Sequence, residues 1–463
     1  MIRLLNAYFP KRILFLGISE WCLVALAFVA ATIARLGMTD ASLLLSYEQG
    51  FLKISVLAAA FIVCMYYFDL YDVSILGNRR EVLTRLVQVL GTVSIVLACV
   101  YYVYPPLELG RGIFLIGLVI VAVILILWRR LFLAINRLPQ FAERVLIFGD
   151  APLGRLLFDE LGARPELGLR IVGQVSEDSA ESGEPRGDVA PTRGDLTRLA
   201  ELERANRIVL AMGEHQEKFP VAQLLRLKNR GVVVQDGADL YETVTGKVPY
   251  ESLRFEWLLF STGMETSRLT LVLKRATSLL FSALGVVIAL PLIPFIIAAV
   301  KLTSAGDIFY KQKRVGCDGK IFDCYKFRTM RADAEVETGP TFASDDDPRV
   351  TPVGRFLRTS RLDEIPQLWN VLKGDMNLVG PRPERPNFVD RFDREIPWYH
   401  LRHSIPPGVT GWAQIRYGYG NSLQDTKQKL GYDLFYIKNM SLGLDLLILF
   451  ETVKIVLLGR GAK

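Results

Sequence analysis

Histidine and cysteine are both scarce in this sequence of 463 residues. The three histidines are His215, His400 and His403, and the five cysteines are Cys22, Cys64, Cys99, Cys317 and Cys324. No two cysteines form a C-x-x-C pair, so the sequence supports neither a zinc site nor a disulfide framework. With so few imidazoles, a mechanism based on histidine is also disfavoured.

Charge is absent from one long stretch and rare in four others. Residues 276–300 contain no charged side chain, and hydrophobic residues make up 51% of the chain. Four more apolar segments lie near the N-terminus, at Ile13–Ala34, Phe51–Tyr71, Val82–Tyr104 and Ile113–Ile135. Each is close to the ~20 residues that cross a hydrocarbon core. We therefore expect a bundle of four membrane helices, rather than buried helices of a soluble core or a cleaved signal peptide.

Basic residues are unevenly distributed around these four segments. They precede the first segment, separate the second from the third and follow the fourth: Arg3, Lys11, Arg12; Arg79, Arg80, Arg85; Arg129, Arg130, Arg137, Arg144. The other two loops carry few. The positive-inside rule then places both ends of the bundle in the cytoplasm, with everything after about residue 140 cytoplasmic or attached to the inner leaflet.

The formal net charge of +7 predicts anionic partners. Because the basic residues flank apolar segments, anionic lipid and phosphate-bearing substrates explain them better than nucleic acid does. We therefore expect membrane lipid as a partner and no nucleic acid.

The sequence from about Glu143 to Glu256 has the pattern of a soluble α/β domain. RVLIFGD, LRIVGQV, RIVLAM and GVVVQD predict strands, and LGRLLFDEL and VAQLLRLKN predict helices. This alternation is typical of a parallel, Rossmann-like sheet.

The first turn of this domain, Gly149–Gly154, departs from a dinucleotide fingerprint. Such a fingerprint needs glycine where Ala151 stands, and Pro152 lacks an amide donor. The acids that follow the second strand, Glu177 and Asp178, are a weak ribose signal. A structural or regulatory domain is favoured, and nucleotide binding is left open. Residues 176–197 predict a surface loop.

Two prolines interrupt the charge-free run. Pro291 and Pro294 would break a helix there, because each lacks an amide and clashes with the preceding turn. A kinked spanning helix would send the following chain outside, whereas a re-entrant helix would return it to the same face. Lysines and an arginine follow at Lys301 and 311–314, so re-entry over about residues 274–301 is favoured.

Three ordered motifs follow this run. They are KRVGCDGKIFDCYKFRTM, RLDEIPQLWNVLKGDMNLVGPRP and PGVTGWAQ. They resemble the bacterial sugar transferases that are polyprenyl-phosphate hexose-1-phosphate transferases, over about residues 268–463. The whole layout resembles the large members similar to the undecaprenyl-phosphate galactose phosphotransferase. QIRYGYG and LLGRGAK are similar to the EpsB-type, exosortase-associated branch.

The resemblance implies a phosphoglycosyl transferase. Such an enzyme moves sugar-1-phosphate from a UDP-sugar to a polyprenyl phosphate and releases UMP. Asp363 would be the nucleophile that forms a covalent phosphosugar intermediate, and Glu364 would hold Mg²⁺, which prefers hard oxygen ligands. An isolated Asp-Glu pair would ordinarily lie in the first turn of a helix, where the helix dipole favours negative charge. Here the surrounding motif favours the catalytic interpretation.

The implied phosphate-binding residues are basic side chains within the same motifs. They are Lys326, Arg328, Arg358, Arg382 and Arg416. Arginine suits this role because it binds phosphate in bidentate fashion. Arg416 is a substitute, because many relatives read Q-[VI]-N-G-R where this chain reads Gln414 to Gly418. A second departure is Leu290, which stands where smaller relatives place serine.

Three further features have two interpretations each. Asp433 either acts in the site or forms a structural salt bridge. Trp412 is expected to be partly buried and to border the membrane or the nucleotide. Residues 440–458 predict an amphipathic helix lying on the bilayer or the catalytic domain, or else plain core packing.

The expected fold is therefore α plus α/β in a membrane protein. Residues 1–140 would form the four-helix transmembrane bundle, 141–267 the Rossmann-like domain, and 268–463 a mostly helical catalytic domain. Every phosphate-binding motif lies after residue 268, so the upstream parts are expected to be dispensable for chemistry. Relatives imply a homodimer. The alternatives are a nucleotide-sugar oxidoreductase that uses the Rossmann-like domain, and a non-catalytic scaffold or regulator of polysaccharide export.

Overall fold

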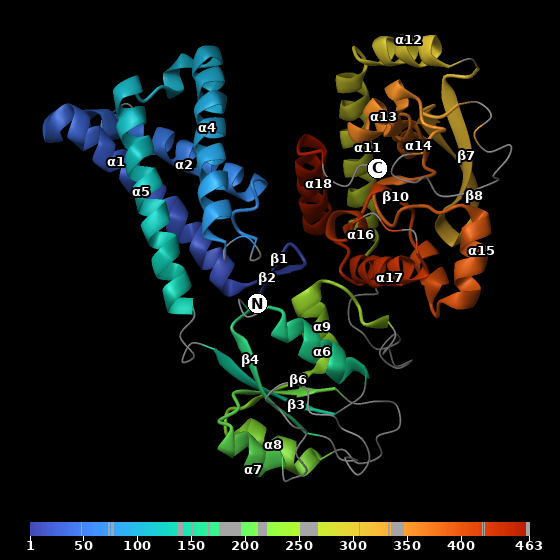
Figure 1. The fold of residues 1–463 in the computed structure, drawn as a ribbon, viewed down its shortest axis with the longest axis horizontal. Coiled ribbons are helices and arrows are strands. Elements are labelled where there is room, and N and C mark those ends of the chain that lie inside the picture. Colours follow the sequence, from blue (N-terminus) through green and yellow to red (C-terminus); the bar gives the residue numbers. More distant parts are fainter. Residues whose placement is uncertain are drawn as a thin grey trace.

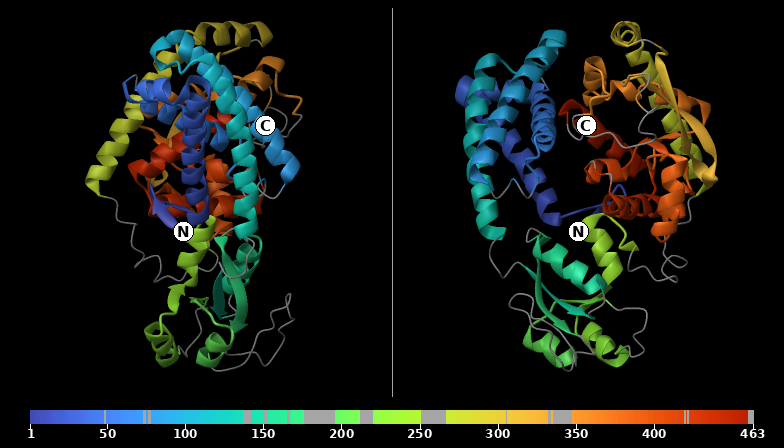
Figure 2. Two further views of the ribbon diagram at one scale, coloured as in Figure 1. Left: turned by 90° about the vertical axis from the view of Figure 1, so that its left-hand side faces the viewer. Right: turned by 45° about the vertical axis from the view of Figure 1, so that its right-hand side comes forward.

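The structure is a computed structural model. It describes residues 1–47, 49–72, 75, 78–136, 142–149, 152–164, 167–175, 196–211, 220–250, 267–304, 306–331, 334, 347–418, 420 and 422–459. Long N-terminal helices and the C-terminal part lie side by side, with an α/β domain below both (Figures 1 and 2).

The N-terminal helices are α1 (Lys11–Tyr47), α2 (Gly50–Tyr67), α4 (Arg79–Val103) and α5 (Arg111–Asn136). The short η1 (Pro105–Leu107) precedes α5. A buried ion pair joins α5 to α1, since Arg129 Nε lies 2.6 Å from Glu20 Oε1. Within the described residues, five helices are long and apolar enough to cross a membrane: these four and α11 (Arg268–Ala289). The predicted apolar helices are confirmed, while their insertion and orientation stay predictions.

The α/β domain contains a parallel sheet in the order β4-β3-β5-β6. Its elements are β3 (Glu143–Phe148), α6 (Pro152–Gly162), β4 (Leu169–Val175), α7 (Leu196–Leu202), β5 (Arg207–Leu210), α8 (Val221–Asn229), β6 (Val233–Asp236) and α9 (Gly237–Thr245). Val145 and Ile147 of β3 pack with α6 and α9, whereas Leu146 and Phe148 pack with α7 and α8. Both faces of the sheet are therefore covered, as a parallel sheet requires. The predicted Rossmann-like pattern is confirmed.

The C-terminal part, residues 267–459, is mostly helical. After α11 come α12 (Ile293–Thr303), β7 (Phe309–Val315), η5 (Cys317–Gly319), β8 (Ile321–Phe327), α13 (Pro352–Thr359), η6 (Leu362–Glu364), α14 (Gln367–Lys373), β9 (Asn377–Val379), α15 (Pro386–Glu395), η7 (Tyr399–His403), β10 (Gly408–Thr410), α16 (Trp412–Arg416), α17 (Leu423–Lys438) and α18 (Leu442–Leu457). Strands β7 and β8 form an antiparallel hairpin, and β9 and β10 pair in parallel.

The charge-free run breaks where its prolines predict. Helix α11 ends at Ala289, a turn follows, and α12 begins at Ile293 with Pro294 in its first turn. Proline is tolerated there because the amides of a first helical turn have no intrahelical partner. Helix α12 runs across the end of α11 (Figure 1). The break is confirmed, and re-entry into a membrane stays a prediction.

A short hairpin near the N-terminus escaped sequence analysis. Strands β1 (Ile2–Leu4) and β2 (Ala7–Phe9) pair in antiparallel fashion. Ala7 is fully buried in the C-terminal core, which centres on α17 and α18. The guanidinium of Arg3 donates to Asn439 Oδ1 at 2.9 Å. The hairpin therefore ties the start of α1 to the C-terminal part.

Candidate active site

A sharp turn between two helices presents the adjacent acids Asp363 and Glu364. Helix α13 starts with Pro352 after Thr351, whose hydroxyl accepts a hydrogen bond from the Gly354 amide at 2.9 Å. After α13 ends, Arg361 adopts a left-handed conformation with φ of 58°, which reverses the chain. The single 3-10 turn η6 that follows carries both acids.

Two predicted cations contact these carboxylates. Lys326 of β8 lies 2.7 Å from Glu364 Oε1 and 3.9 Å from Asp363 Oδ2. Arg382, in the Gly-Pro-Arg-Pro loop after β9, lies 2.6 Å from the same Glu364 oxygen. The side chain of Asp363 is only 9% exposed. Residues from two of the quoted motifs therefore converge on one acidic pair.

The two acids have opposite electrostatic environments. Burial raises the pKa of Asp363, and the charge of Lys326 only partly opposes this. Burial would also raise the pKa of Glu364, but Arg382 and Lys326 together hold that pKa well below its usual range. Glu364 therefore stays ionised as the partner of the cations, and Asp363 is the more basic of the two carboxylates.

A buried arginine supports the loop that carries Arg382. The guanidinium of Arg402 donates to the Arg382 carbonyl at 2.8 Å and to the Tyr399 hydroxyl at 2.7 Å. It also lies 2.9 Å from Asp433, whose pKa burial raises to about 6. Asp433 thus forms a salt bridge that supports this loop, and it also lines the cavity.

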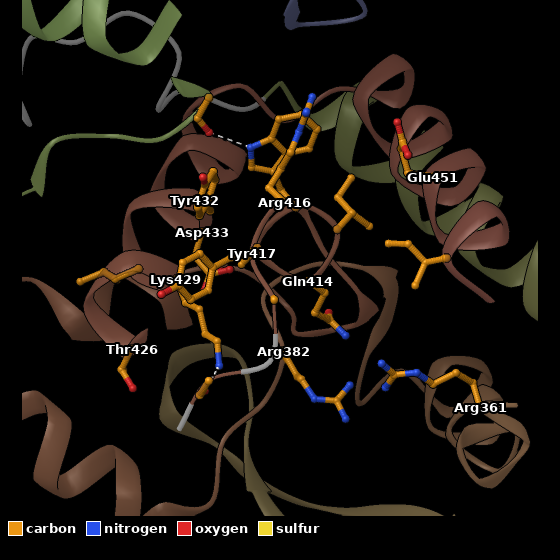
Figure 3. Close-up of a pocket in the computed structure, with 18 of the residues that line it drawn as sticks. Arg361, Arg382, Gln414, Arg416, Tyr417, Thr426, Lys429, Tyr432, Asp433 and Glu451 are labelled. Carbon is orange, nitrogen blue, oxygen red and sulfur yellow. Dashed lines mark hydrogen bonds between the residues drawn. The ribbon is translucent and has the colours of Figure 1, made fainter. Parts of the chain in front are cut away.

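The acidic pair opens into a cavity of about 1290 Å³. Arg328 and Arg358 line it, and each is tethered: Arg328 donates to the Ser304 carbonyl at 2.8 Å and Arg358 to the Thr329 hydroxyl at 3.0 Å. Figure 3 shows Arg361 and Arg382 directed into the same part of the cavity. The structure therefore gathers the predicted basic residues around one space.

Arg416 lies on another wall of this cavity. It sits beside Tyr432 (Figure 3), and its guanidinium carbon is 4.4 Å from the centre of the Trp412 ring. Trp412 is buried rather than partly exposed. Pro291 and Pro294 do not line the cavity and lie at the α11–α12 break.

Sequence reasoning missed two residues of the site. Arg361 lines the cavity and lowers the pKa of Glu364 by its charge. Its position, two residues before Asp363 in the quoted motif, was a usable signal. Arg402 could not be found this way, because its partners Arg382 and Asp433 come from distant segments.

The donor set around Glu364 suits a magnesium ion shared with substrate. Within the part of the chain that the structure describes, no three His, Cys, Asp or Glu side chains converge. Mg²⁺ commonly takes one or two carboxylates and completes its shell with phosphate oxygens and water. Glu364 is the predicted protein ligand, so phosphate and water oxygens would have to complete the shell, and magnesium stays a prediction.

The nucleotide-binding question for the Rossmann-like sheet is not decided by its first turn. Gly149 has φ of 114°, and its carbonyl accepts a hydrogen bond from the Gln174 side chain at 2.9 Å. Asp150, Ala151, Glu177 and Asp178, and most of the predicted loop 176–197, lie outside the described residues.

Comparison with known proteins agrees with the motifs. Residues 269–459 match the family described as bacterial sugar transferase, and residues 66–234 match the CoA-binding domain family. The undecaprenyl-phosphate galactose phosphotransferase of Salmonella typhimurium is 30% identical over 351 residues, which cover 71% of each chain. This chain belongs to the bacterial sugar transferase family. The predicted resemblance to this family is confirmed, and the predicted enzyme class, a phosphoglycosyl transferase, agrees with the name of this relative.

Other members of the family differ in the sugar that their names specify. A UDP-N-acetylgalactosamine-undecaprenyl-phosphate N-acetylgalactosaminephosphotransferase of Aeromonas hydrophila is 44% identical over 222 residues. These residues cover 48% of this chain and 52% of that protein. The UDP-glucose:undecaprenyl-phosphate glucose-1-phosphate transferase of Escherichia coli K12 is 34% identical, with 67% and 66% covered. The chain thus spans about half to two thirds of these relatives.

Proposed function

We propose that this sugar transferase moves sugar-1-phosphate from a UDP-sugar to undecaprenyl phosphate and releases UMP. The observation that carries the proposal is Asp363, buried with a raised pKa beside Lys326, in a cavity whose walls hold several more cations. The names of the relatives support both the acceptor and the class of reaction. The product would begin the lipid-linked assembly of an exopolysaccharide or an O-antigen-like glycan.

The first step is nucleophilic attack by Asp363. Its ionised carboxylate attacks the sugar-bearing phosphorus of the UDP-sugar, forming a carboxylate–phosphorus bond. The bridging P–O bond breaks, and UMP leaves with that electron pair. Lys326, Arg328, Arg358 and Arg382 offset the repulsion between the carboxylate and the diphosphate. Raised basicity suits the nucleophile, whereas an acid held by two cations, as Glu364 is, would be a poor one.

The second step regenerates the enzyme. An oxygen of the polyprenyl phosphate attacks the same phosphorus, and the bond to Asp363 breaks with its electrons returning to the carboxylate. The product is a polyprenyl diphosphate sugar. No proton needs to be stored on the enzyme between the steps, which is consistent with the scarcity of histidine in the chain.

We propose Mg²⁺ as the cofactor, held by Glu364 together with substrate phosphate oxygens. When bound, the ion would neutralise phosphate charge. We also propose a bacterial inner-membrane protein, for which its apolar helices give support. The distribution of basic residues supports a site on the cytoplasmic face and re-entry at α11–α12. The resemblance to relatives supports a homodimer.

The covalent step is tested by incubating the purified chain with a UDP-sugar and Mg²⁺ but no lipid acceptor. A peptide containing Asp363 gains the mass of a sugar phosphate, and UMP appears in a stoichiometric burst. Asp363→Asn abolishes the label, the burst and turnover, because it removes the nucleophile.

Asp393→Asn is the matched control. Asp393 is 48% exposed and does not line the cavity, so the label, the burst and turnover should remain. Absence of both label and burst in the unmodified enzyme, with kinetics that require both substrates bound together, would establish direct transfer instead. Absence of UMP release with every UDP-sugar and undecaprenyl phosphate would remove the proposed function itself.

A further inference from the structure

The Rossmann-like domain reaches the active-site cavity through the C-terminal end of α9. Gly246 ends this helix in a left-handed conformation with φ of 68°, and residues 243–246 line the cavity. The carbonyl of Gly246 accepts a hydrogen bond from Trp412 Nε1 at 2.7 Å. One residue of the Rossmann-like domain therefore contacts a tryptophan in the most distal of the three sequence motifs.

Further contacts on both sides of this hydrogen bond fix α9 against the C-terminal part. Lys438 Nζ lies 2.9 Å from Glu242 Oε1, and the two side chains are 10% and 4% exposed. The Val248 amide donates to the Gly431 carbonyl at 2.9 Å. Because these contacts flank Gly246 in sequence, its carbonyl has little freedom to move relative to Trp412.

Trp412 links this interface to Arg416. Its ring stacks on Phe435 with centres 5.6 Å apart, and it is 2% exposed. The guanidinium of Arg416 lies 4.4 Å from the same ring, while the residue itself is exposed to the cavity. An arginine held by an aromatic ring keeps its N–H donors available for a phosphate.

We infer that the Rossmann-like domain positions Arg416 through Gly246 and Trp412, and that this arrangement binds a phosphate group of one of the two substrates. The inference rests on the proposed function for the identity of those substrates. Trp412 is then a positioning residue, and Arg416 contacts the ligand. The upstream domain, expected from sequence to be dispensable for chemistry, contributes to substrate affinity.

A double-mutant cycle on the full-length chain tests this dependence. Arg416→Ala raises the KM of the UDP-sugar or of undecaprenyl phosphate about tenfold, with kcat changed less than about threefold, because one charge-assisted contact is lost. Trp412→Leu raises the KM of the same substrate to a similar extent. The double variant is no worse than either single one, because Trp412 acts through Arg416.

Two more variants separate positioning from general damage. Trp412→Phe keeps a ring for Arg416 but loses the hydrogen bond to Gly246, so its KM should lie between those of the wild type and Trp412→Leu. Lys247→Ala changes the same interface, where Lys247 contacts Gln428 at 2.9 Å, but the residue does not line the cavity. Its KM values should stay at wild-type level. Thermal unfolding confirms that each variant is folded.

Binding measured without turnover keeps this inference separate from the proposed reaction. Calorimetry with UDP and, separately, with undecaprenyl phosphate in detergent should show the same loss of affinity in Arg416→Ala, Trp412→Leu and the double variant. The ligand whose binding weakens identifies the substrate. If Trp412→Leu, or Trp412→Phe where the leucine variant does not fold, binds both ligands as the wild type does, the inference is wrong. Fully additive losses would also overturn it. Either result holds whether or not UMP release is seen.

Discussion

At the scale of residues, the chemistry depends on two neighbouring carboxylates, Asp363 and Glu364, whose pKa values shift in opposite directions. Lys326 and Arg382 bind the same oxygen of Glu364, and Lys326 also lies 3.9 Å from Asp363. Burial raises the pKa of Asp363 while the cations lower that of Glu364. Pairs of titratable groups pushed apart in this way have different roles in catalysis.

The pH dependence of activity should report Asp363. The carboxylate must be ionised to attack, so kcat/KM falls as the pH drops through its pKa, and the acid limb lies above the ~4 of a free aspartate. In Lys326→Gln the opposing charge is lost. The pKa of Asp363 then rises further, so the acid limb of the remaining activity moves to higher pH.

Lys320→Gln is the control for this profile, because Lys320 is an exposed cation that does not line the cavity. Its acid limb should match that of the wild type. An acid limb that stays in place in Lys326→Gln would show that another group controls the ionisation.

The sequence predicted most residues of this site that lie inside long motifs, although it missed Arg361, and it missed those that depend on tertiary contact. Asp363, Glu364, Lys326 and Arg382 were identified because each belongs to a quoted motif, and the structure brings them together. The partners of Asp433 and Trp412, Arg402 and Gly246, come from other segments. No pattern in one sequence records such pairs.

At the scale of elements, a buried lysine near the start of α11 anchors this helix to the C-terminal core. Lys274 of α11 lies 2.8 Å from Asp445 of α18 and donates to the Val379 carbonyl at 2.9 Å. It also bonds the hydroxyl of Tyr436. Helix α11 is therefore fixed near the loop that carries Arg382, while its far end meets the proline break.

Removal of both prolines should change how this element meets the membrane. Proline costs ~3 kcal/mol or more inside a helix, so Pro291→Ala with Pro294→Ala favours a straight helix that continues into α12. The labelling uses a chain whose native cysteines are replaced and which carries Thr303→Cys. With both prolines present, an impermeant thiol reagent should label this cysteine from the cytoplasmic side. The double alanine variant moves toward periplasmic labelling.

Pro352→Ala serves as a control, since Pro352 begins α13 and not the membrane element. Its labelling should remain cytoplasmic. Periplasmic labelling of Thr303→Cys with both prolines intact would rule out re-entry.

Periodicity found the long elements and missed the short ones for a physical reason. The four apolar N-terminal helices and the alternating α/β segments carry many residues of one pattern. Strands β1 and β2 have three residues each, and the turn between them requires positive φ at Leu5 and Asn6. They are stabilised by the C-terminal core, which the local sequence does not encode.

At the scale of the whole molecule, α18 connects the N-terminal helices to the C-terminal part. It packs against the C-terminal core on one side and against α2 on the other. Glu451 bonds the Tyr66 hydroxyl, and Lys454 lies 2.7 Å from Asp69. The ring of Phe450 lies 5.6 Å from that of Tyr66. Tyr66 and Asp69 also line the cavity, so the N-terminal helices complete one of its walls. The sequence predicted the three parts but not these contacts between them.

A shortened chain of residues 267–463 should retain the chemistry and lose affinity. Asp363 and its cations are all present, so Asp363 still acquires the sugar phosphate. Because Gly246 is missing, the KM of the substrate that Arg416 contacts should rise about tenfold, as in Trp412→Leu. UMP release and peptide labelling, compared with the full chain in the same detergent, measure both effects.

The fold of the shortened chain is verified by its unfolding transition. A folded shortened chain with unchanged KM values would leave the upstream parts without a role in affinity. A folded one that never labels Asp363 would give them a role in the chemistry.

The docking of Ala7 also has a consequence for biosynthesis. Residues 2–9 leave the ribosome before α17 has been synthesised, yet Ala7 is fully buried against the cluster that contains Phe435. Contacts of such long sequence separation form late, because loop closure precedes any gain from them. The small hairpin must therefore wait beside the first membrane helix until almost all of the protein is made. We expect completion of the C-terminal core to be the last folding event, and its rate to depend on those eight residues.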